Sequence, residues 1–492
     1  MKDLKQRTMR GGLAKIAAQI TNLVLRTGTL MIMARLLVPR DFGLVGMVTA
    51  VIGVFSVFRD FGLSAAAVQR SSITGEQSST LFWINLLVGV VMGLIAVALG
   101  PFVAAFYHEP RLVAVTAALA TGFVFNAAGV QHSALLERQM RFVTLSMIDI
   151  TSLLISTTVG VGMALRGFGY WALVATSIIP PLVYSAGVWI MSRWVPGRPK
   201  KHTEIFHMMR FGGTLTLNGL VMYFAMNLDK VLLGRFWGVN ALGIYGRAYQ
   251  LVNIPTDNLN SAAGGVVFAA LSRLQDQPAR LRNFFLKGYS LVLSLTVPIT
   301  IMWALFGGVI IRVFLGSKWV SAIPVFRLLA PTTLGFAIMA PLGWLLSSCG
   351  LVGRGLRIAL VIGPLLVVGY AIGLPWGPKG VACAYSSVMI LSVLPLIAWS
   401  RKGTPVLFRD LLLSIGRPLA AGIVAAGVAF IPILLWGASL HPLARLALAA
   451  VIVVCVYLWI LLYVLRQKQL YVEIMRGFFK PNSADDAVAV SA

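Results

Sequence analysis

Long apolar runs alternate with short polar segments from near residue 13 to near residue 465. A helix that crosses a bilayer needs about 20 apolar residues, and on that measure the sequence predicts about fourteen spanning helices. The turns between them are marked by Pro or Gly, as at Pro39, Gly238 and Pro442. The expected spans are 13–37, 43–66, 80–106, 111–133, 143–165, 168–192, 211–236, 242–271, 284–311, 320–347, 353–374, 379–400, 412–436 and 442–465. The expected fold class is an all-α polytopic membrane protein.

Two parts of the chain resemble each other. The segment 35–46 carries Arg, Gly and Gly at the offsets that recur in the segment 235–246, each time after an apolar helix. A second correspondence joins the regions near residues 167–177 and 377–387. The sequence therefore predicts two pseudo-symmetric six-helix bundles, 1–200 and 201–400, followed by two additional helices and a cytoplasmic tail in 401–492. Duplicated halves around a central cavity are typical of transporters.

Composition supports the membrane interpretation. Of the 492 residues, 58% are hydrophobic and 11% are charged, whereas a soluble domain carries about 25% charged residues. The net charge is +26, and a basic balance in a soluble protein would point to nucleic acid. Here the cations stand between apolar spans, so the positive-inside rule and anionic lipid headgroups account for them, and no nucleic-acid partner is expected.

The distribution of Lys and Arg over the loops predicts the orientation. Most of them fall in alternate connections, with the longest basic ones near 193–210 and 272–287. The positive-inside rule places these connections, and both chain termini, in the cytoplasm. The connections on the other side are short, so no external domain is expected to hold an active site, and the chain is not expected to be an enzyme.

Charged and amide side chains inside spans are the candidate functional residues, because burying them in hydrocarbon is costly. Asn22 and Arg26 share a face of the first helix at helical spacing. A guanidinium suits phosphate, since its fork donates two hydrogen bonds at once. Arg26 and Asn22 are therefore predicted to bind substrate, with a structural interhelical pair as the open alternative.

The seventh span carries a second polar stripe that includes Asn218 and Asp229, with Lys230 beside it. A buried carboxylate can take up a proton, because desolvation disfavours its charged form. Asp229 is thus a candidate coupling site for H⁺ or Na⁺, and Asn218 and Lys230 are candidate substrate ligands. A fixed salt bridge from Asp229 to Arg235 or to a neighbouring helix is the alternative.

The eighth span is the most polar one. Asn253, Asp257 and Asn258 lie around Pro255, which cannot donate to the helix ladder and is expected to kink the helix. Polar, broken helices at membrane depth line cavities or pack in protein. These three side chains are predicted to contact substrate, and Asp257 is a second coupling-ion candidate; a packing seam is the alternative.

Other charges lie near the ends of spans and are candidate gating residues. They could pair to close one side of the protein, although snorkelling to headgroups explains them equally simply. The five histidines show no metal-ligand spacing within a span, and neither a metal site nor a nucleotide-binding loop is expected. The gating candidates are Arg35, Arg59, Asp60, Asp149 and Arg235.

Five strings together resemble the polysaccharide transporter family, the Wzx-like lipid-linked oligosaccharide flippases of the multidrug/oligosaccharidyl-lipid/polysaccharide superfamily. The first is similar to the family signature and reads Ala-Arg-Leu-Leu-Val-Pro-Arg-Asp-Phe-Gly-Leu from Ala34. The resemblance covers roughly residues 10–400 and is strongest to the branch that serves colanic acid and succinoglycan export. The other four strings are 58–66, 134–142, 227–234 and 271–275.

The resemblance implies a pair of helix bundles that open alternately to each side of the bacterial inner membrane. The expected cargo is an undecaprenyl-diphosphate-linked oligosaccharide, flipped for exopolysaccharide or lipopolysaccharide synthesis. No cofactor is implied beyond a possible H⁺ or Na⁺ gradient, and membrane lipids, a polysaccharide polymerase and a co-polymerase are the further partners.

Three other functions remain open. An ion-coupled multidrug or metabolite antiporter of the same superfamily would share the fold and the intramembrane carboxylates. A polysaccharide polymerase or ligase would need catalytic residues in a sizeable external loop, which the predicted spans do not leave room for. A structural scaffold of the export complex is the third.

Overall fold

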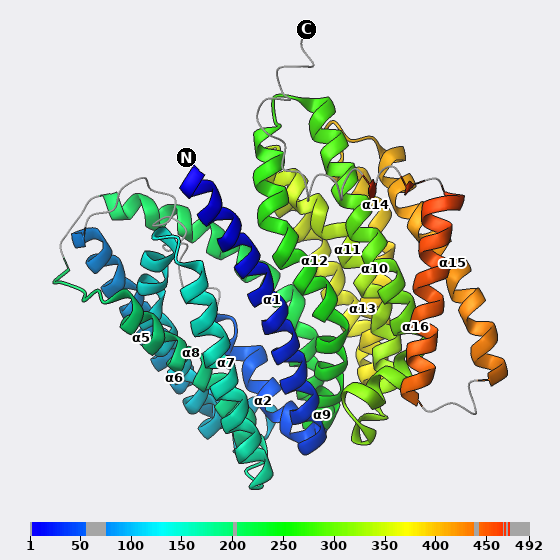
Figure 1. Ribbon diagram of the computed structural model, residues 1–492. Coiled ribbons are helices and arrows are strands. Elements are labelled where there is room, and N and C mark those ends of the chain that lie inside the picture. The colour runs from blue at the N-terminus through cyan, green and yellow to red at the C-terminus, as the bar shows by residue number, and fades with distance from the viewer. Residues whose placement is uncertain are drawn as a thin grey trace. The chain divides into compact units, whose positions relative to one another are not determined.

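The chain is built of helices connected by short turns (Figure 1). The computed structural model describes residues 2–55, 75–199, 204–436, 442–465, 467–468 and 471–472. Within these ranges no strand occurs, and nine helical stretches are long and apolar enough to cross a membrane. The protein is thus an all-α, multi-pass membrane protein, as the apolar pattern predicts.

The helix bounds follow the predicted spans closely in most places. The helices are α1 Lys2–Leu36, α2 Pro39–Ile52, α5 Gly75–Tyr107, α6 Leu112–Arg138, α7 Phe142–Leu165, α8 Tyr170–Ser192, α9 Glu204–Arg273, α10 Pro278–Phe314, η1 Ser317–Trp319, α11 Ala322–Ser348, α12 Val352–Gly373, η2 Leu374–Trp376, α13 Gly377–Leu391, α14 Val393–Ser400, α15 Phe408–Trp436, α16 Pro442–Trp459 and η3 Ile460–Val464. The expected span 43–66 is described only in its first part, within α2, and the expected span 379–400 is divided between α13 and α14.

Helix α9 contains two predicted spans. Its backbone leaves the helical region at Gly238, where φ is 78° and ψ is −176°. A positive φ of this kind costs a residue with a Cβ far more than it costs glycine, so Gly238 interrupts the helix without strain. The predicted turn at Gly238 is therefore confirmed. The helix continues through Pro255, whose ring removes one hydrogen bond from the ladder.

The chain forms two compact units. Unit 1 comprises Met1–Arg247, Phe314–Ala322 and Gly363–Val381, and unit 2 comprises Ala248–Val313, Ile323–Ile362 and Ala382–Ala492. This grouping describes which segments pack together, whereas the predicted bundles 1–200 and 201–400 describe a repeat in the sequence. The predicted division of the chain into bundles stays a prediction.

Unit 1 is held together by close packing of small residues between long helices. Helix α6 packs against both α5 and α8, and α7 packs against both α8 and α1 (Figure 1). A Cβ built on Gly89 of α5 would lie 2.4 Å from the Cβ of Ala127 on α6. Such contacts let helix backbones approach closely, which drives helix association in lipid, where no hydrophobic force between helices is available.

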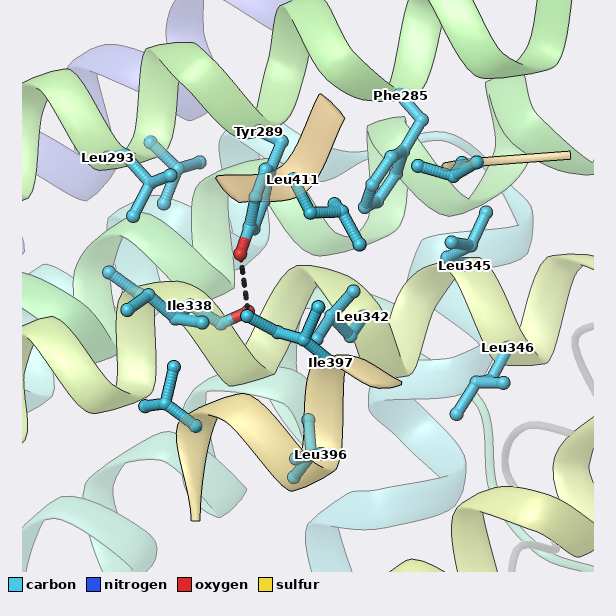
Figure 2. Packing of buried hydrophobic residues seen from close by; sticks show 14 of the residues in the cluster. Phe285, Tyr289, Leu293, Ile338, Leu342, Leu345, Leu346, Leu396, Ile397 and Leu411 are labelled. Carbon is cyan, nitrogen blue, oxygen red and sulfur yellow. Dashed lines mark hydrogen bonds between the residues drawn. The ribbon is translucent and has the colours of Figure 1, made fainter. Parts of the chain in front are cut away.

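Unit 2 has a core of large side chains from α10, α11, α14 and α15 (Figure 2). Phe285 and Tyr289 stack with ring centroids 5.4 Å apart. The hydroxyl of Tyr289 donates to the carbonyl oxygen of Ile338 at 3.4 Å, so the one polar atom of this ring is satisfied. Leu351 and Val406, in the turns before α12 and before α15, pack into the same core. The core therefore fixes the positions of both turns.

Candidate functional site

Polar side chains connect α1 to α7 inside unit 1. Asn22 Nδ2 donates to Asp149 Oδ2 at 2.7 Å, and the hydroxyls of Thr29 and Thr157 are 2.7 Å apart. The two contacts lie about two helical turns apart on both helices, so α1 and α7 run parallel and in register here. The structure thus joins a predicted substrate ligand, Asn22, to a predicted gating residue, Asp149.

Arg26 lies on α1 between the two contacts, one turn after Asn22, and its side chain is exposed on unit 1. The neighbouring polar atoms are not all satisfied. Asn22 Oδ1 is buried and has no hydrogen-bond partner within the described residues. The exposed guanidinium of Arg26 gives this face of α1 a cation that can donate two hydrogen bonds to a phosphate.

Asp229 is fully buried on α9, before the break at Gly238. Its Oδ2 accepts a 2.7 Å hydrogen bond from the hydroxyl of Tyr245, which lies after the break and is also fully buried. Its Oδ1 accepts from the backbone N–H of Lys230 at 2.8 Å. The carboxylate therefore joins the two segments of α9 across the bend.

The ammonium group of Lys230 is hydrogen-bonded within its own helix. Its Nζ donates to Asn227 Oδ1 at 2.8 Å and approaches the carbonyl of Met226 at 3.4 Å. Because Arg235 donates instead to His108 Nδ1 at 3.1 Å, the expected alternative of an Asp229–Arg235 salt bridge is replaced by the bond to Tyr245.

The polar segment around Pro255 belongs to unit 2. Asn253 is buried, and its Oδ1 has no hydrogen-bond partner in the part of the chain that the structure describes. Asn258 Nδ2 donates to the carbonyl of Ile254 at 2.6 Å, within its own helix. Asp257 is exposed. The segment therefore offers one buried amide and one exposed carboxylate.

The two repeated segments meet where α1 ends and α2 begins, a place that we name the α1–α2 end. A Cβ on Gly43 would lie 1.7 Å from the carbonyl oxygen of Val239, and a Cβ on Gly243 would lie 1.9 Å from that of Pro39. The contacts are reciprocal, because each glycine meets the residue four positions before the other glycine. Such a reciprocal pairing is what a two-fold relation between the predicted repeats would produce.

Loops at this end also bond the ends of helices that are distant in the sequence. Lys318 Nζ donates to the carbonyl of Arg35 at 3.1 Å, and Trp319 Nε1 donates to that of Ala34 at 2.8 Å. In the counterpart contact Arg235 bonds His108. The gating candidate Arg35 is thus contacted at its backbone carbonyl by one turn, and the gating candidate Arg235 bonds another turn through its guanidinium.

Three predicted residues cannot be placed. Arg59 and Asp60 lie outside the described residues, as does the side chain of Asn218. Sequence reasoning in turn missed Tyr245, Thr157 and His108. Tyr245 could have been found from its place in the repeated segment, whereas nothing in the sequence singles out Thr157 or His108, because their partners lie more than a hundred residues away.

The sequence is similar to known proteins of polysaccharide biosynthesis. A family described as "Polysaccharide biosynthesis protein" matches residues 32–324. The chain is 27% identical over 431 residues to the lipopolysaccharide biosynthesis protein WzxC of Escherichia coli (strain K12), covering 85% of each chain. It is 25% identical over 328 residues to the succinoglycan biosynthesis transport protein ExoT of Rhizobium meliloti (strain 1021), covering 66% of each chain.

A solved structure shares the fold. The inward closed conformation of the lipid II flippase MurJ superposes with a TM-score of 0.72 at 14% sequence identity, covering 92% of this chain and 97% of that one. At this identity the likeness concerns the arrangement of the helices.

Proposed function

The chain belongs to the polysaccharide biosynthesis protein family, and from this premise we propose that it flips lipid-linked oligosaccharides across a membrane. The cargo is an oligosaccharide repeat unit attached through a diphosphate to undecaprenol, moved from the cytoplasmic to the periplasmic leaflet of a bacterial inner membrane. Both chain termini lie in the cytoplasm. A diphosphate headgroup does not cross hydrocarbon unaided, because moving its charge into a low dielectric is very costly.

The observation that carries the proposal is the set of polar contacts between helices α1 and α7, which we name the polar seam. Between α1 and α7, Asn22 donates to Asp149 and the hydroxyl of Thr29 bonds that of Thr157, while Arg26 is exposed on α1. Amides and hydroxyls suit sugar recognition, and a guanidinium suits a diphosphate. None of these groups needs to make or break a covalent bond, so the function is transport, and enzymatic activity is not part of it.

Alternating access provides the movement. The reciprocal Gly43 and Gly243 contacts support closure at the α1–α2 end, with the cargo entering from the other side. Separation of the two helical segments that cross at Gly43 and Gly243 would open that end. Arg35 and Arg235 would then leave their loop contacts and interact with headgroups or water. Arg59, Asp60 and Asp149 are proposed to act in the same way toward the cytoplasm.

A cation gradient supplies the driving force in this proposal. Asp229 supports proton coupling, because it is a fully buried carboxylate beside the break in α9, and uptake of a proton there would neutralise its charge. Asp257, which is exposed in unit 2, is the second candidate. Removal of the flipped product by a polymerase and its co-polymerase would pull the reaction forward.

Reconstitution tests the function directly. Proteoliposomes would carry a fluorescent undecaprenyl-diphosphate-linked repeat unit, and an external glycosidase would report its arrival in the outer leaflet. We expect protection of the lipid without the protein and progressive cleavage with it. Transport of small cationic drugs together with an unmoved lipid would instead identify a multidrug antiporter. Accumulation of complete repeat units on the cytoplasmic leaflet of a deletion strain would exclude a polymerase.

A further inference from the structure

A partly buried arginine in unit 2 lacks a full set of partners. Arg354 lies in the first turn of α12, and its side chain is half-buried. Its Nη1 is buried and has no hydrogen-bond partner among the residues that the structure describes. Buried guanidinium nitrogens are nearly always bonded, since leaving a charged donor unsatisfied costs more than leaving a neutral one. The missing partner is therefore an acceptor from outside the described chain.

The surroundings of this nitrogen are a basic turn. A Cβ on Gly403 would lie 3.6 Å from both Nη1 and Nη2 of Arg354, so the guanidinium lies against the turn between α14 and α15. The backbone of Gly403 has a φ of 71°, which lets the turn reverse at this point. Arg401 and Lys402 precede it, and both are exposed. Three cationic side chains are thus gathered around one glycine.

The carboxylate of this turn is already engaged. Asp410 Oδ2 accepts from Arg282 Nε at 2.8 Å and Nη2 at 2.7 Å, and also from the backbone N–H of Leu407 at 3.2 Å. The guanidinium of Arg401 lies over the ring of Phe408, 5.7 Å from its centroid. Asp410 therefore fixes the start of α15 and does not neutralise the cations near Gly403.

The packing makes the arrangement rigid. Leu351, three residues before Arg354, and Val406, three residues after Gly403, are packed into the core shown in Figure 2. The core therefore fixes the backbone on both sides of the contact between Arg354 and Gly403, while the side chains of Arg401 and Lys402 stay exposed. Leu411 near the start of α15 and Leu281 near the start of α10 belong to the same core.

We propose that Arg354, Arg401 and Lys402 form a binding site for a phosphate group at the end of unit 2 that the positive-inside rule assigns to the cytoplasm. A tetrahedral phosphate offers several acceptor oxygens, which can bond Nη1 of Arg354 and receive the charges of the turn together. The phosphate comes either from an anionic lipid headgroup or from a diphosphate of the cargo class. The site does not depend on the identity of the cargo.

Binding of inorganic pyrophosphate to the full-length protein in phosphatidylcholine nanodiscs tests the site. We expect Arg354→Gln to weaken binding roughly tenfold, since the variant loses a charge-assisted hydrogen bond to the phosphate. The matched control is Arg280→Gln, which removes the same charge from the same end, where Arg280 is exposed and bonded to Gln277. This control should bind within twofold of the unchanged protein.

The outcomes separate the explanations. Equal affinity of Arg354→Gln and the unchanged protein would overturn the site, as would an equal loss in Arg280→Gln, which would indicate diffuse charge. If Arg354→Gln does not fold, the double variant Arg401→Gln/Lys402→Gln tests the turn, with a severalfold loss expected and unchanged affinity overturning the site. Repeating the titration in phosphatidylglycerol nanodiscs identifies the source. Competition by the lipid shows a headgroup site, and undiminished binding shows a site for a non-lipid or cargo phosphate.

Discussion

Gly43 and Gly243 pack directly against each other: a Cβ on Gly243 would lie 3.1 Å from the backbone nitrogen of Gly43. The two residues hold equivalent positions in segments 200 residues apart. Each also meets a carbonyl oxygen at the start of the other's helical segment, Val239 for Gly43 and Pro39 for Gly243. The repeat that the sequence shows as three matching residues is thus, in space, one close crossing of two helix backbones.

This crossing predicts that even one methyl group will disturb it. Gly43→Ala places a Cβ 1.7 Å from a backbone oxygen, which cannot rotate away. We expect a loss of about 1–3 kcal/mol, the usual cost of overpacking, seen as a lower thermal unfolding temperature in detergent. Gly246→Ala is the control, because nothing lies within 4 Å of its added Cβ. Equal unfolding temperatures for the two variants would show that the crossing does not form.

The bond between Asn22 and Asp149 predicts energetic coupling between α1 and α7. A double-mutant cycle with Asn22→Leu and Asp149→Leu should give a coupling of about 0.6–1.7 kcal/mol, the range of interhelical hydrogen bonds in lipid. The measurement is reversible unfolding in mixed micelles. Asn22→Leu combined with Thr158→Val serves as the control cycle, since the hydroxyl of Thr158 donates to the Leu154 carbonyl of its own helix. If the two changes in the free energy of unfolding were additive in the first cycle, Asn22 and Asp149 would not be coupled.

Asp229 and Tyr245 allow the coupling role to be separated from a structural one. Tyr245→Phe removes the 2.7 Å hydrogen bond and keeps the carboxylate, so it should lower stability by about 1–3 kcal/mol and retain gradient-driven transport. Asp229→Asn keeps a hydrogen-bond acceptor but cannot lose a proton, and it should abolish the response to an imposed pH gradient. The readout is the initial flipping rate with and without that gradient. An unchanged gradient response in Asp229→Asn would limit Asp229 to fastening the two segments of α9.

Arg26 is the cation that we expect to meet the diphosphate. Arg26→Ala should abolish polymer export while the protein still inserts into the membrane, because its charge and its two-pronged hydrogen bonds are lost together. Arg26→Lys keeps the charge without the fork and should retain part of the activity. Export is measured as secreted polysaccharide, and insertion as membrane-fraction protein. Normal export by Arg26→Ala would remove this residue from the substrate path.

The orientation has its own test. Reporter fusions at residues 200 and 480 should both give a cytoplasmic signal, because the positive-inside rule predicts that basic connections lie on that side. A fusion in the turn at Glu109, between α5 and α6, should give a periplasmic signal. A periplasmic signal at either of the first two positions would break the alternation of spans.

The positions of the spans could be read from the sequence, because the length and apolarity of a spanning helix are local properties set by bilayer thickness. The same holds for the turn at Gly238, where local backbone chemistry decides the conformation. The repeat was also visible, as matching Arg and Gly residues. Sequence alone therefore determined the fold class and the family resemblance.

Only the tertiary structure decided which polar groups meet. The partners of Asp149 and Asp229 are Asn22 and Tyr245, and each choice depends on how helices or helical segments pack rather than on local spacing. A buried polar group must find a partner wherever packing brings one, and a one-dimensional pattern does not contain that geometry. For the same reason the sequence did not reveal that Gly43 and Gly243 cross. Their role is to leave space for another backbone, and that backbone is distant in the sequence.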